Sequence, residues 1–347
     1  MDIKKLVKLT ENDYAAVLGD DDTDFEVNRY IDTGSYSFNA LLSGSIYGGL
    51  AGNKVLALAG EPSTGKTFYA IAIAKRFLEE NPEGFIVCFE SESAITKQMI
   101  VDRKIDVDQF AIIPVITIQE FRTQAMKIIN AYLEEPESER KPMLFILDSL
   151  GNLSTEKEIS DIADGKDTRD MTRAQLIKGA FRSLTLKLGR AKIPMIVTNH
   201  VYDVIGAFFP IQKMSGGSGI QYSASQVVFL SKKKDKDADN EVTGVIITGT
   251  LKKSRITIEN KKAETLLNYQ TGLDRYYGLI DLAVKFGIFK KLSKQIELPD
   301  GTKKFENAII KNPEKYFTKE ILDQIDEFCK GEFLYGNTNV TNDEGEK

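Results

Sequence analysis

The strongest constraint on the fold of this chain is one short stretch in which an apolar strand, a glycine-rich loop and a helix follow one another. Residues 55–59 are aliphatic, residues 60–67 read GEPSTGKT, and residues 68–80 have a helical composition. The pattern G-x-x-x-x-G-K-[ST] indicates a phosphate-binding loop when it stands in this context. Its glycines let backbone N–H groups point inward, and the helix adds its positive N-terminal end. The sequence therefore predicts a site for phosphate groups.

The side chains of this loop predict ATP and Mg²⁺ as ligands. Lys66 is expected to reach the β- and γ-phosphates, and Thr67 offers a hydroxyl to Mg²⁺, which prefers oxygen ligands. Asp148 ends the apolar run 143–148 at the carboxyl edge of its strand, where open α/β sheets bind ligands, and is expected to act on Mg²⁺ through water. The predicted nucleotide-binding residues are Gly60, Glu61, Pro62, Ser63, Thr64, Gly65, Lys66, Thr67 and Asp148.

Apolar runs of β-type residues alternate with helical patterns along most of the chain. Because turn residues bound these runs and helices separate them, they indicate an α/β core with a mostly parallel, twisted sheet covered by helices on both faces. The runs are residues 55–59, 85–89, 111–115, 143–148, 194–198, 226–230 and 243–251. Residues 151–169 and 201–222 match no regular element, and loops of this length are usually functional or mobile.

The charge distribution suggests four parts. Residues 1–30 combine lysines with an acidic cluster and are expected to form an N-terminal oligomerisation arm. Residues 31–274 are expected to form the core, residues 275–335 a small C-terminal domain, and residues 336–347 an acidic, flexible tail.

Composition excludes several classes of protein. The 347 residues include 46 Lys and Arg against 51 Asp and Glu, so the formal net charge of −5 gives no general attraction for nucleic acid, and any DNA binding must be local. Two cysteines and one histidine exclude a disulfide scaffold and a histidine-based metal centre. Since the sequence shows neither a long apolar span nor a signal peptide, we expect a cytoplasmic protein with no membrane partner.

Hydrolysis of ATP needs a group that activates water, and two glutamates are candidates. Glu90 and Glu92 both follow the run 85–89, and their spacing alone does not choose between them. His200 follows the run 194–198 and precedes one of the long loops. A lone histidine is more often structural. This position instead favours a sensor that donates a hydrogen bond to the γ-phosphate and transmits its loss to residues 201–222.

Five segments resemble the RecA-type recombinase family, and specifically its phage UvsX-like branch. They are IDTGSYSFNALLSG, GEPSTGKT, FESESAIT, ILDSLGNLSTEKE with DMTRAQ, and IVTNH with MSGGSGIQYSAS. The resemblance covers about residues 31–290 and is weak at both ends of the chain. If a phage encodes the chain, its compartment is the host bacterial cytoplasm.

The resemblance implies roles for individual residues. Glu92 lies where the family has its water-activating glutamate, and His200 lies at the nucleotide sensor position. Lys253 and Arg255 align with two cations that reach the ATP of a neighbouring subunit. Cations at this place would stabilise the negative charge of the transition state. Met99 stands where an aromatic residue usually stacks on adenine, which makes preference for adenine less secure than phosphate binding.

The resemblance also assigns residues 151–169 and 201–222 to two DNA-binding loops. Single-stranded DNA is held without sequence preference by cations and backbone amides, and a filament repeats weak contacts at every subunit. The predicted DNA-binding residues are Lys166, Arg169, Arg173, Lys213, Gly216, Gly217 and Gly219.

The predicted function is ATP-dependent homologous recombination. The chain would form a helical filament on single-stranded DNA, pair it with homologous duplex DNA, and hydrolyse ATP in a DNA-stimulated reaction. Single-strand-binding and mediator proteins are expected partners. Two alternatives stay open: a hexameric DNA helicase with the same core fold, and a non-catalytic filament scaffold that depends on ATP.

Overall fold

The computed structural model describes most of the chain in two compact units. The described residues are 2–12, 15–19, 26–27, 29–166, 170–203, 212–217, 219–236 and 240–336. The first unit comprises Met1–Tyr30, Ala51–Ala57 and Phe77–Ala224, and the second comprises Ile31–Leu50, Leu58–Arg76 and Ser225–Lys347. The division falls inside strand β3 (Val55–Gly60) and helix α3 (Lys66–Glu80), so each of these contributes residues to both units.

A parallel sheet with the strand order β7-β6-β4-β5 forms the centre of the first unit. Its strands are β4 (Phe85–Glu90), β5 (Phe110–Pro114), β6 (Met143–Asp148) and β7 (Met195–Asp203). Glu90 pairs in register with Asp148, so β4 and β6 end together at one edge. Polar residues that follow these strands therefore gather at that edge.

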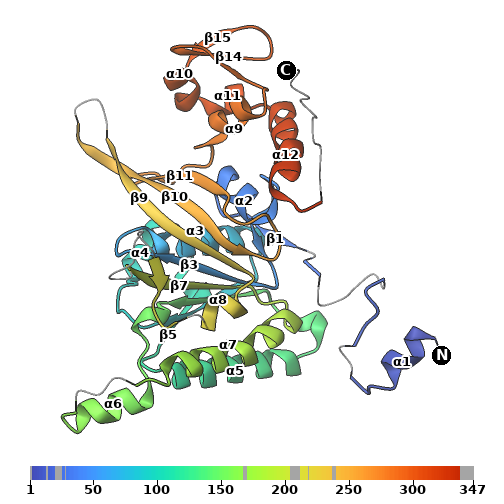
Figure 1. Cartoon of the computed structure of the whole chain (residues 1–347), viewed down its shortest axis with the longest axis vertical. Coiled ribbons are helices and arrows are strands. Elements are labelled where there is room, and N and C mark those ends of the chain that lie inside the picture. Colours follow the sequence, from blue (N-terminus) through green and yellow to red (C-terminus); the bar gives the residue numbers. More distant parts are fainter. Residues whose placement is uncertain are drawn as a thin grey trace, which may run out of the picture. The chain divides into compact units, whose positions relative to one another are not determined.

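The first unit also contains short and long helices. They are α1 (Ile3–Lys8), α4 (Lys97–Asp102), α5 (Ile118–Glu134), α6 (Glu156–Ala163), α7 (Arg173–Arg190) and α8 (Gly219–Ser223). Helices α5 and α7 run side by side (Figure 1), and the rings of Phe121 and Phe181 lie 5.9 Å apart between them. Ile177, Phe181 and Leu184 form a buried stripe on α7, as the periodicity of an amphipathic helix requires.

The second unit contains antiparallel strands. They are β9 (Gln226–Lys236), β10 (Val242–Ser254), β11 (Lys262–Asn268) and β12 (Gly272–Leu273), in the order β12-β11-β10-β9 (Figure 1). The α/β class with a mixed, mostly parallel sheet is confirmed, and the runs 226–230 and 243–251 form an antiparallel pair within it. Only residues 237–241 separate β9 from β10, and a parallel pair needs a much longer crossover.

The C-terminal part of the second unit consists of short elements and one longer helix. They are α9 (Leu279–Lys285), β13 (Lys290–Lys291), β14 (Gln295–Glu297), β15 (Lys303–Phe305), α10 (Glu306–Lys311), α11 (Pro313–Tyr316) and α12 (Lys319–Phe333). The buried carboxylate of Asp326 on α12 accepts the Ile46 N–H at 2.8 Å, next to helix α2 (Tyr36–Ser43). This contact anchors α12 to the turn after α2. Within the described ranges, no helix has the length and apolarity that crossing a membrane requires.

Both stretches that matched no regular element contain some. Residues 151–169 include the end of a 3-10 turn, Leu150–Asn152, and helix α6, which begins with a capping box formed by Thr155 and Glu158. Residues 201–222 include the end of β7, strand β8 (Gln212–Met214), which pairs antiparallel with β7, and most of α8. The prediction of two structureless loops is therefore wrong for the residues that are described.

Candidate nucleotide-binding and catalytic site

The glycine-rich loop folds back on itself between β3 and α3. Lys66 is the first residue of α3 and is only 7% exposed, and its Nζ donates hydrogen bonds to the carbonyl oxygens of Gly60 at 2.9 Å and Glu61 at 2.8 Å. Thr64 Oγ1 also donates to Glu61 O, at 2.8 Å. A buried ammonium needs oxygen partners, and phosphate oxygens with a full negative charge are stronger ones than carbonyls.

Both glycines of the loop are required by its geometry. Gly65 has a φ of +87°, in the left-handed region, and a Cβ there would lie 2.8 Å from Ile247 Cδ1. A Cβ on Gly60 would lie 2.6 Å from Thr64 Oγ1 and 2.7 Å from Leu230 O. These close approaches leave the backbone in the tight turn that a phosphate-binding loop uses. The residues present therefore fit a nucleotide's phosphates.

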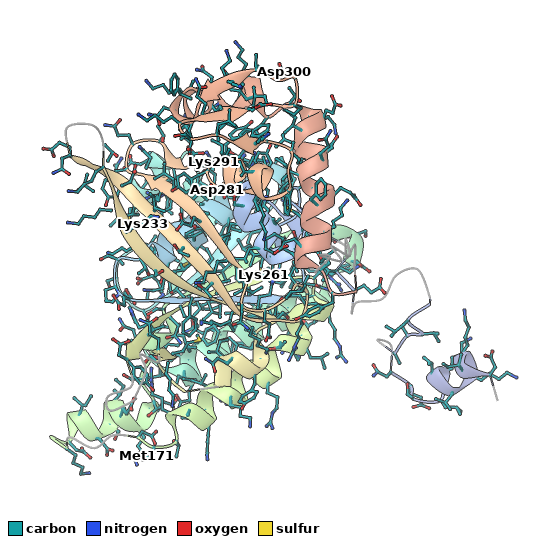
Figure 2. The ribbon with its side chains drawn as sticks, turned by 45° about the horizontal axis from the view of Figure 1, so that its top comes forward. Met171, Lys233, Lys261, Asp281, Lys291 and Asp300 are labelled. Carbon is teal, nitrogen blue, oxygen red and sulfur yellow. The ribbon has the colours of Figure 1, made fainter. Side chains whose placement is uncertain are left out.

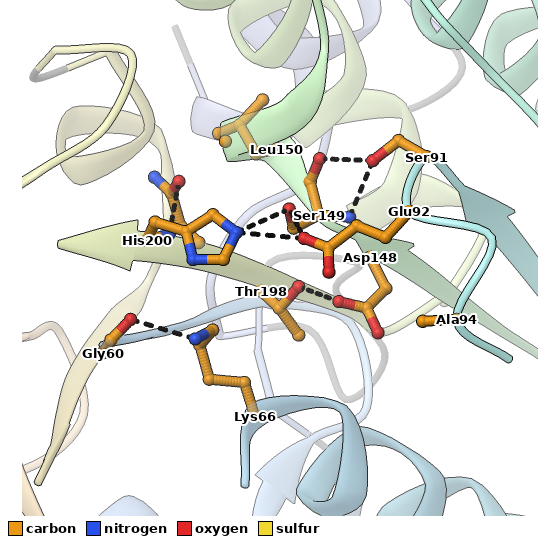
Figure 3. Close-up of polar contacts among 12 residues, drawn as sticks. Gly60, Lys66, Ser91, Glu92, Ala94, Asp148, Ser149, Leu150, Thr198 and His200 are labelled. Atoms are coloured by element: carbon orange, nitrogen blue, oxygen red, sulfur yellow. Dashed lines mark hydrogen bonds and ion pairs between the residues drawn. The ribbon is translucent and has the colours of Figure 1, made fainter. Parts of the chain in front are cut away.

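Asp148 lies at the end of β6 and is 2% exposed. One of its carboxylate oxygens, Oδ1, accepts a hydrogen bond from the hydroxyl of Thr198 on β7 (Figure 3). Burying a carboxylate is costly without hydrogen bonds or a cation, so the Thr198 hydroxyl stabilises Asp148 in its charged form. Thr198 was not a predicted site residue, because a threonine inside an apolar run carries no signal of its own.

The two glutamates after β4 have different environments. Glu90 is 6% exposed, and its carboxylate accepts the backbone N–H groups of Glu92 at 3.1 Å, Ser93 at 2.8 Å and Ala94 at 2.9 Å. It therefore holds the turn that follows the strand. The side chain of Glu92 is 27% exposed and extends toward other strand ends. Geometry thus distinguishes two residues that spacing alone did not.

Glu92, Ser149 and His200 form a strand-end cluster (Figure 3). The Ser149 hydroxyl donates a hydrogen bond to Glu92 Oε1, and His200 Nε2 lies 3.0 Å from the same oxygen and 3.4 Å from Ser149 Oγ. Ser91 holds the two loops together, because its hydroxyl donates to Ser149 O at 2.9 Å and accepts from Ser149 N at 3.0 Å. The cluster brings together residues that follow β4 and β6 with one on β7.

His200 is linked to the second predicted DNA loop through its backbone. Its carbonyl oxygen accepts the Ser215 N–H at 2.8 Å, and the neighbouring Asn199 donates its side-chain amide to Ser215 O at 2.9 Å. Beyond His200, Val201 pairs with Met214 as β7 and β8 run antiparallel. A displacement of this loop therefore acts directly on His200.

The glycines of the second loop pack against helix α7. A Cβ on Gly216 would lie 2.5 Å from Ile177 Cδ1, and one on Gly219 would lie 2.9 Å from the backbone nitrogen of Lys178. A Cβ on Gly217, which has a φ of +77°, would meet Ala174 Cβ at 3.1 Å. These glycines are thus needed for the close packing of the second loop against α7.

The predicted DNA-binding cations lie in different settings. Lys166 is exposed and pairs with Asp164 at 3.0 Å, and Lys213 is exposed on β8. Arg173 donates hydrogen bonds to Leu153 O at 3.0 Å and Gly151 O at 2.9 Å, so its guanidinium holds the start of the first loop. Arg169 lies outside the described residues, as do residues 204–211 and the tail from residue 337. Met171 beside α7 is 86% exposed (Figure 2).

Lys253 and Arg255 lie at the end of β10, in the second unit. The pairing of β9 with β10 shifts between Leu251 and Lys253, which marks a β-bulge. Burial, with a smaller effect from the neighbouring Arg255, lowers the pKa of Lys253 to about 8, while Glu259 acts in the opposite direction. Arg255 is exposed.

The other expected ligand contacts are placed as follows. Met99 lies on the short helix α4 and is half-buried. Thr67 lies in the first turn of α3. Among the residues that the structure describes, no group of three or more His, Cys, Asp or Glu side chains is arranged to hold a metal ion.

Comparison with known proteins decides the family. The sequence model described as the RecA N-terminal domain matches residues 2–274 of the chain. The chain belongs to the RecA family. This match confirms the RecA-type resemblance read from the motifs. Members of this family bind nucleotides.

Individual RecA-family relatives agree with this assignment. The chain is 31% identical over 253 residues to the "Recombination and repair protein" of Enterobacteria phage T4, which covers 73% of the chain and 63% of that protein. It is 25% identical over 260 residues to "Protein RecA" of Mycoplasmopsis pulmonis, covering 75% of the chain and 72% of that protein. The alignment with the phage protein thus spans less than two thirds of that relative's length.

Proposed function

We propose that this chain is an ATP-dependent recombinase that forms a helical filament on single-stranded DNA and pairs it with a homologous duplex. The observation that carries the proposal lies in the first unit. Glu92, the proposed water-activating residue, contacts His200, and His200 is joined through its backbone to the loop that includes Ser215. Such a connection is what coupling of hydrolysis to DNA binding requires.

ATP is held by the loop of residues 60–67. The N–H groups at the start of α3 and the ammonium of Lys66 take the phosphates, and the close packing around Gly60 and Gly65 keeps the loop tight. Thr67 and, through water, Asp148 are the side chains that would hold Mg²⁺. Bound there, Mg²⁺ neutralises charge on the phosphates. Met99 is the proposed contact for the adenine ring.

Glu92 is the proposed general base. Its carboxylate is partly exposed and accepts side-chain hydrogen bonds, whereas the Glu90 carboxylate is buried and accepts three backbone N–H groups. A base must reach solvent to take a proton from water. His200 is the proposed sensor, which donates to the γ-phosphate when ATP is bound.

DNA is held by the two loops and their neighbours. Lys166, Arg169 and Lys213 supply positive charge, and the backbone amides around Gly216 and Gly217 supply donors. Arg173 contributes by holding Gly151 in place. Each subunit contributes few cations, so affinity depends on repetition along the filament and falls steeply with salt.

The ATP site is completed by a second copy of the chain. Lys253 and Arg255 are the cations proposed to reach the neighbour's phosphates. The N-terminal arm is proposed to contact another copy, since Ile3, Leu6 and Leu9 are exposed within and just after α1. Single-strand-binding and mediator proteins are proposed as further partners.

The shared site is tested by mixing two inactive variants. Lys66→Ala lacks the phosphate lysine, and Lys253→Ala lacks the cation for its neighbour. Each alone should lose DNA-stimulated ATP hydrolysis. In mixed filaments roughly a quarter of the interfaces would combine an intact loop from one variant with an intact Lys253 from the other, because the interface is head-to-tail. Hydrolysis should therefore return in the mixture.

Three further results would contradict the proposal. A mixture that stays inactive, while each variant still binds DNA, would place Lys253 outside the site. Closed six-membered rings in electron microscopy with ATP and single-stranded DNA would favour a helicase. Filaments that hydrolyse ATP at the same rate with and without DNA, and that fail to exchange strands, would favour a scaffold.

A further inference from the structure

We propose that Gly151 is a positioning residue of a latch in which His200 and Ser149 keep Glu92 inactive until a DNA loop moves. The inference rests on the proposed function and concerns the regulation of its catalytic site. It starts from three contacts within the first unit. Glu92 Oε1 is engaged by the Ser149 hydroxyl and by His200 Nε2, and Gly151 lies against the histidine ring.

The contacts at Glu92 Oε1 keep this oxygen from contacting a water molecule. Nε2 of His200 is 3.0 Å from the carboxylate oxygen and therefore carries the hydrogen of the ring, while the Ser149 hydroxyl donates to the same oxygen. An oxygen that already accepts two hydrogen bonds has its lone pairs occupied and is not available to a water molecule. Glu92 in this arrangement is held in a resting state.

The same ring nitrogen is required for the proposed sensor role. Nε2 carries one hydrogen, which it donates either to Glu92 or to a phosphate oxygen of the bound nucleotide. The two contacts are therefore alternatives. When His200 turns to the nucleotide, Glu92 Oε1 loses the imidazole donor and can accept a proton from water. A two-state element of this kind links ligand binding to catalysis.

Gly151 permits the resting state because it has no side chain. A Cβ at this position would lie 2.7 Å from His200 Cδ2 and 3.1 Å from Asn199 Oδ1. The φ of Gly151 lies outside the left-handed region, so the backbone itself does not require glycine here. What requires glycine is the position of the imidazole ring.

Both proposed DNA loops start next to this latch. Gly151 begins the stretch 151–169 and is held by Arg173 through its carbonyl oxygen, at 2.9 Å. His200 leads into the stretch 201–222 and is held by Ser215, at 2.8 Å. DNA that displaces either stretch changes the distance between the ring and Glu92. The latch therefore explains how two loops far apart in the sequence would control one base.

The first experiment compares Gly151→Ala with wild type and with Gly179→Ala. Gly179 lies in α7, where a Cβ would meet no atom within 4 Å, so it is a matched control. Without DNA, Gly151→Ala should hydrolyse ATP about tenfold faster than wild type, which corresponds to about 1.4 kcal/mol. The affinity for a fluorescent ATP analogue should stay close to wild type, and Gly179→Ala should match wild type throughout.

The second experiment tests whether the effect passes through His200. In a His200→Ala background the added methyl group has no ring to displace, so Gly151→Ala should change the DNA-free rate no further. Substitutions of two contacting residues show such non-additive effects on the rate. If Gly151→Ala instead caused a general loss of structure, its effect would add to that of His200→Ala. If Gly151→Ala fails to fold, Ser149→Ala removes the other donor and should raise the DNA-free rate in the same direction.

The third measurement observes the ring directly. His200 is the single histidine of the chain, so an untagged protein with ¹³C-labelled histidine gives one imidazole signal in NMR. That signal should shift in Gly151→Ala and in Glu92→Gln, and on addition of single-stranded DNA with ATP, but not in Gly179→Ala.

The outcomes separate the latch from the proposed function. A DNA-free rate that is unchanged or lower in Gly151→Ala, in a protein whose wild type is stimulated by DNA, overturns the latch alone. The latch is also overturned if Gly151→Ala raises the DNA-free rate equally in the His200→Ala background. It is overturned as well if the histidine NMR signal is the same in Glu92→Gln as in wild type. A wild-type protein that never hydrolyses ATP in the presence of single-stranded DNA overturns the proposed function and the latch with it.

Discussion

The phosphate loop and the strand-end cluster are built in opposite ways. The loop belongs to the second unit, and two of its side chains bond within a few residues, since Lys66 and Thr64 both donate to carbonyl oxygens of the same turn. The cluster belongs to the first unit, where the contact between Glu92 and His200 joins residues 108 positions apart. One region is local in sequence, and the other exists only after the sheet has formed.

This difference predicts how each region responds to substitution. A change in the loop removes a ligand contact and leaves the sheet intact. A change in the cluster alters contacts between strand ends, so catalysis, stability and loop position are affected together. The four predictions below test this distinction, beginning with the largest expected effect.

Lys66→Ala should abolish nucleotide binding and lower ATP hydrolysis by at least about 1,000-fold, because no other charge of the loop replaces the ammonium. Its melting temperature should stay close to wild type, since the change is confined to the loop. Isothermal titration with ATP and a thermal melt measure both. Lys141→Ala, which removes only an exposed pair with Glu83, is the control. Hydrolysis at the wild-type rate in Lys66→Ala would exclude the loop as the ATP site.

Glu92→Gln and Glu90→Gln should separate catalysis from stability. Glu92→Gln should lower turnover by about 100- to 1,000-fold while ATP binding persists, as loss of a general base does. Glu90→Gln should lower the free energy of unfolding by about 1–3 kcal/mol, because a neutral amide is a weaker acceptor for three backbone N–H groups. Single-turnover kinetics and urea unfolding measure the two effects. The reverse pattern would assign the base to Glu90.

Thr198→Val should destabilise the first unit by about 1–3 kcal/mol, since it leaves Asp148 without the Thr198 hydrogen bond in a buried position. The affinity for ATP should also depend less on Mg²⁺, because the carboxylate loses its fixed orientation. Urea unfolding and titrations at several Mg²⁺ concentrations measure these changes. Thr185→Val removes a hydroxyl that bonds only its own helix, at Phe181 O, and should change neither quantity. Equal effects in both variants would exclude a positioning role for Thr198.

Lys253 should give the smallest effect, which depends on pH. Its pKa in the folded chain is lowered from 10.5 to about 8 by burial and by Arg255, so between these values the unfolded chain binds more protons. The free energy of unfolding should therefore rise with pH across this window, by about 0.5 kcal/mol or less given solvent screening. Lys253→Met lacks the titrating group and should lack this rise. A difference of the opposite sign would show that Lys253 is stabilised as a cation.

The phosphate loop could be predicted from sequence because its function depends on contiguous residues. The pattern around Gly60 and Gly65 needs only a preceding strand and a following helix, and both are visible as runs of residues. The capping box of α6, formed by Thr155 and Glu158, is equally local and was overlooked as a helix start.

The arrangement of the cluster could not be predicted in this way. Glu90 ends β4, and Glu92 lies in the bend after it, next to Ser93, which has a φ of +53°, so the alternation of a strand gives no guide to where the Glu92 side chain points. Thr198 and Gly151 act through their positions in the folded sheet. The sequence indicated a mostly parallel sheet and did not single out β9 and β10, the pair that runs antiparallel.

The bulge in β10 has a consequence for the comparison of related chains. One extra residue, Lys252, is accommodated there, so Lys253 keeps its pairing with Val227. A relative that lacks this residue would keep both strands in register and retain the same two cations. Alignments around this position should therefore admit a gap of one residue, because an ungapped alignment would match Lys253 and Arg255 to the wrong columns.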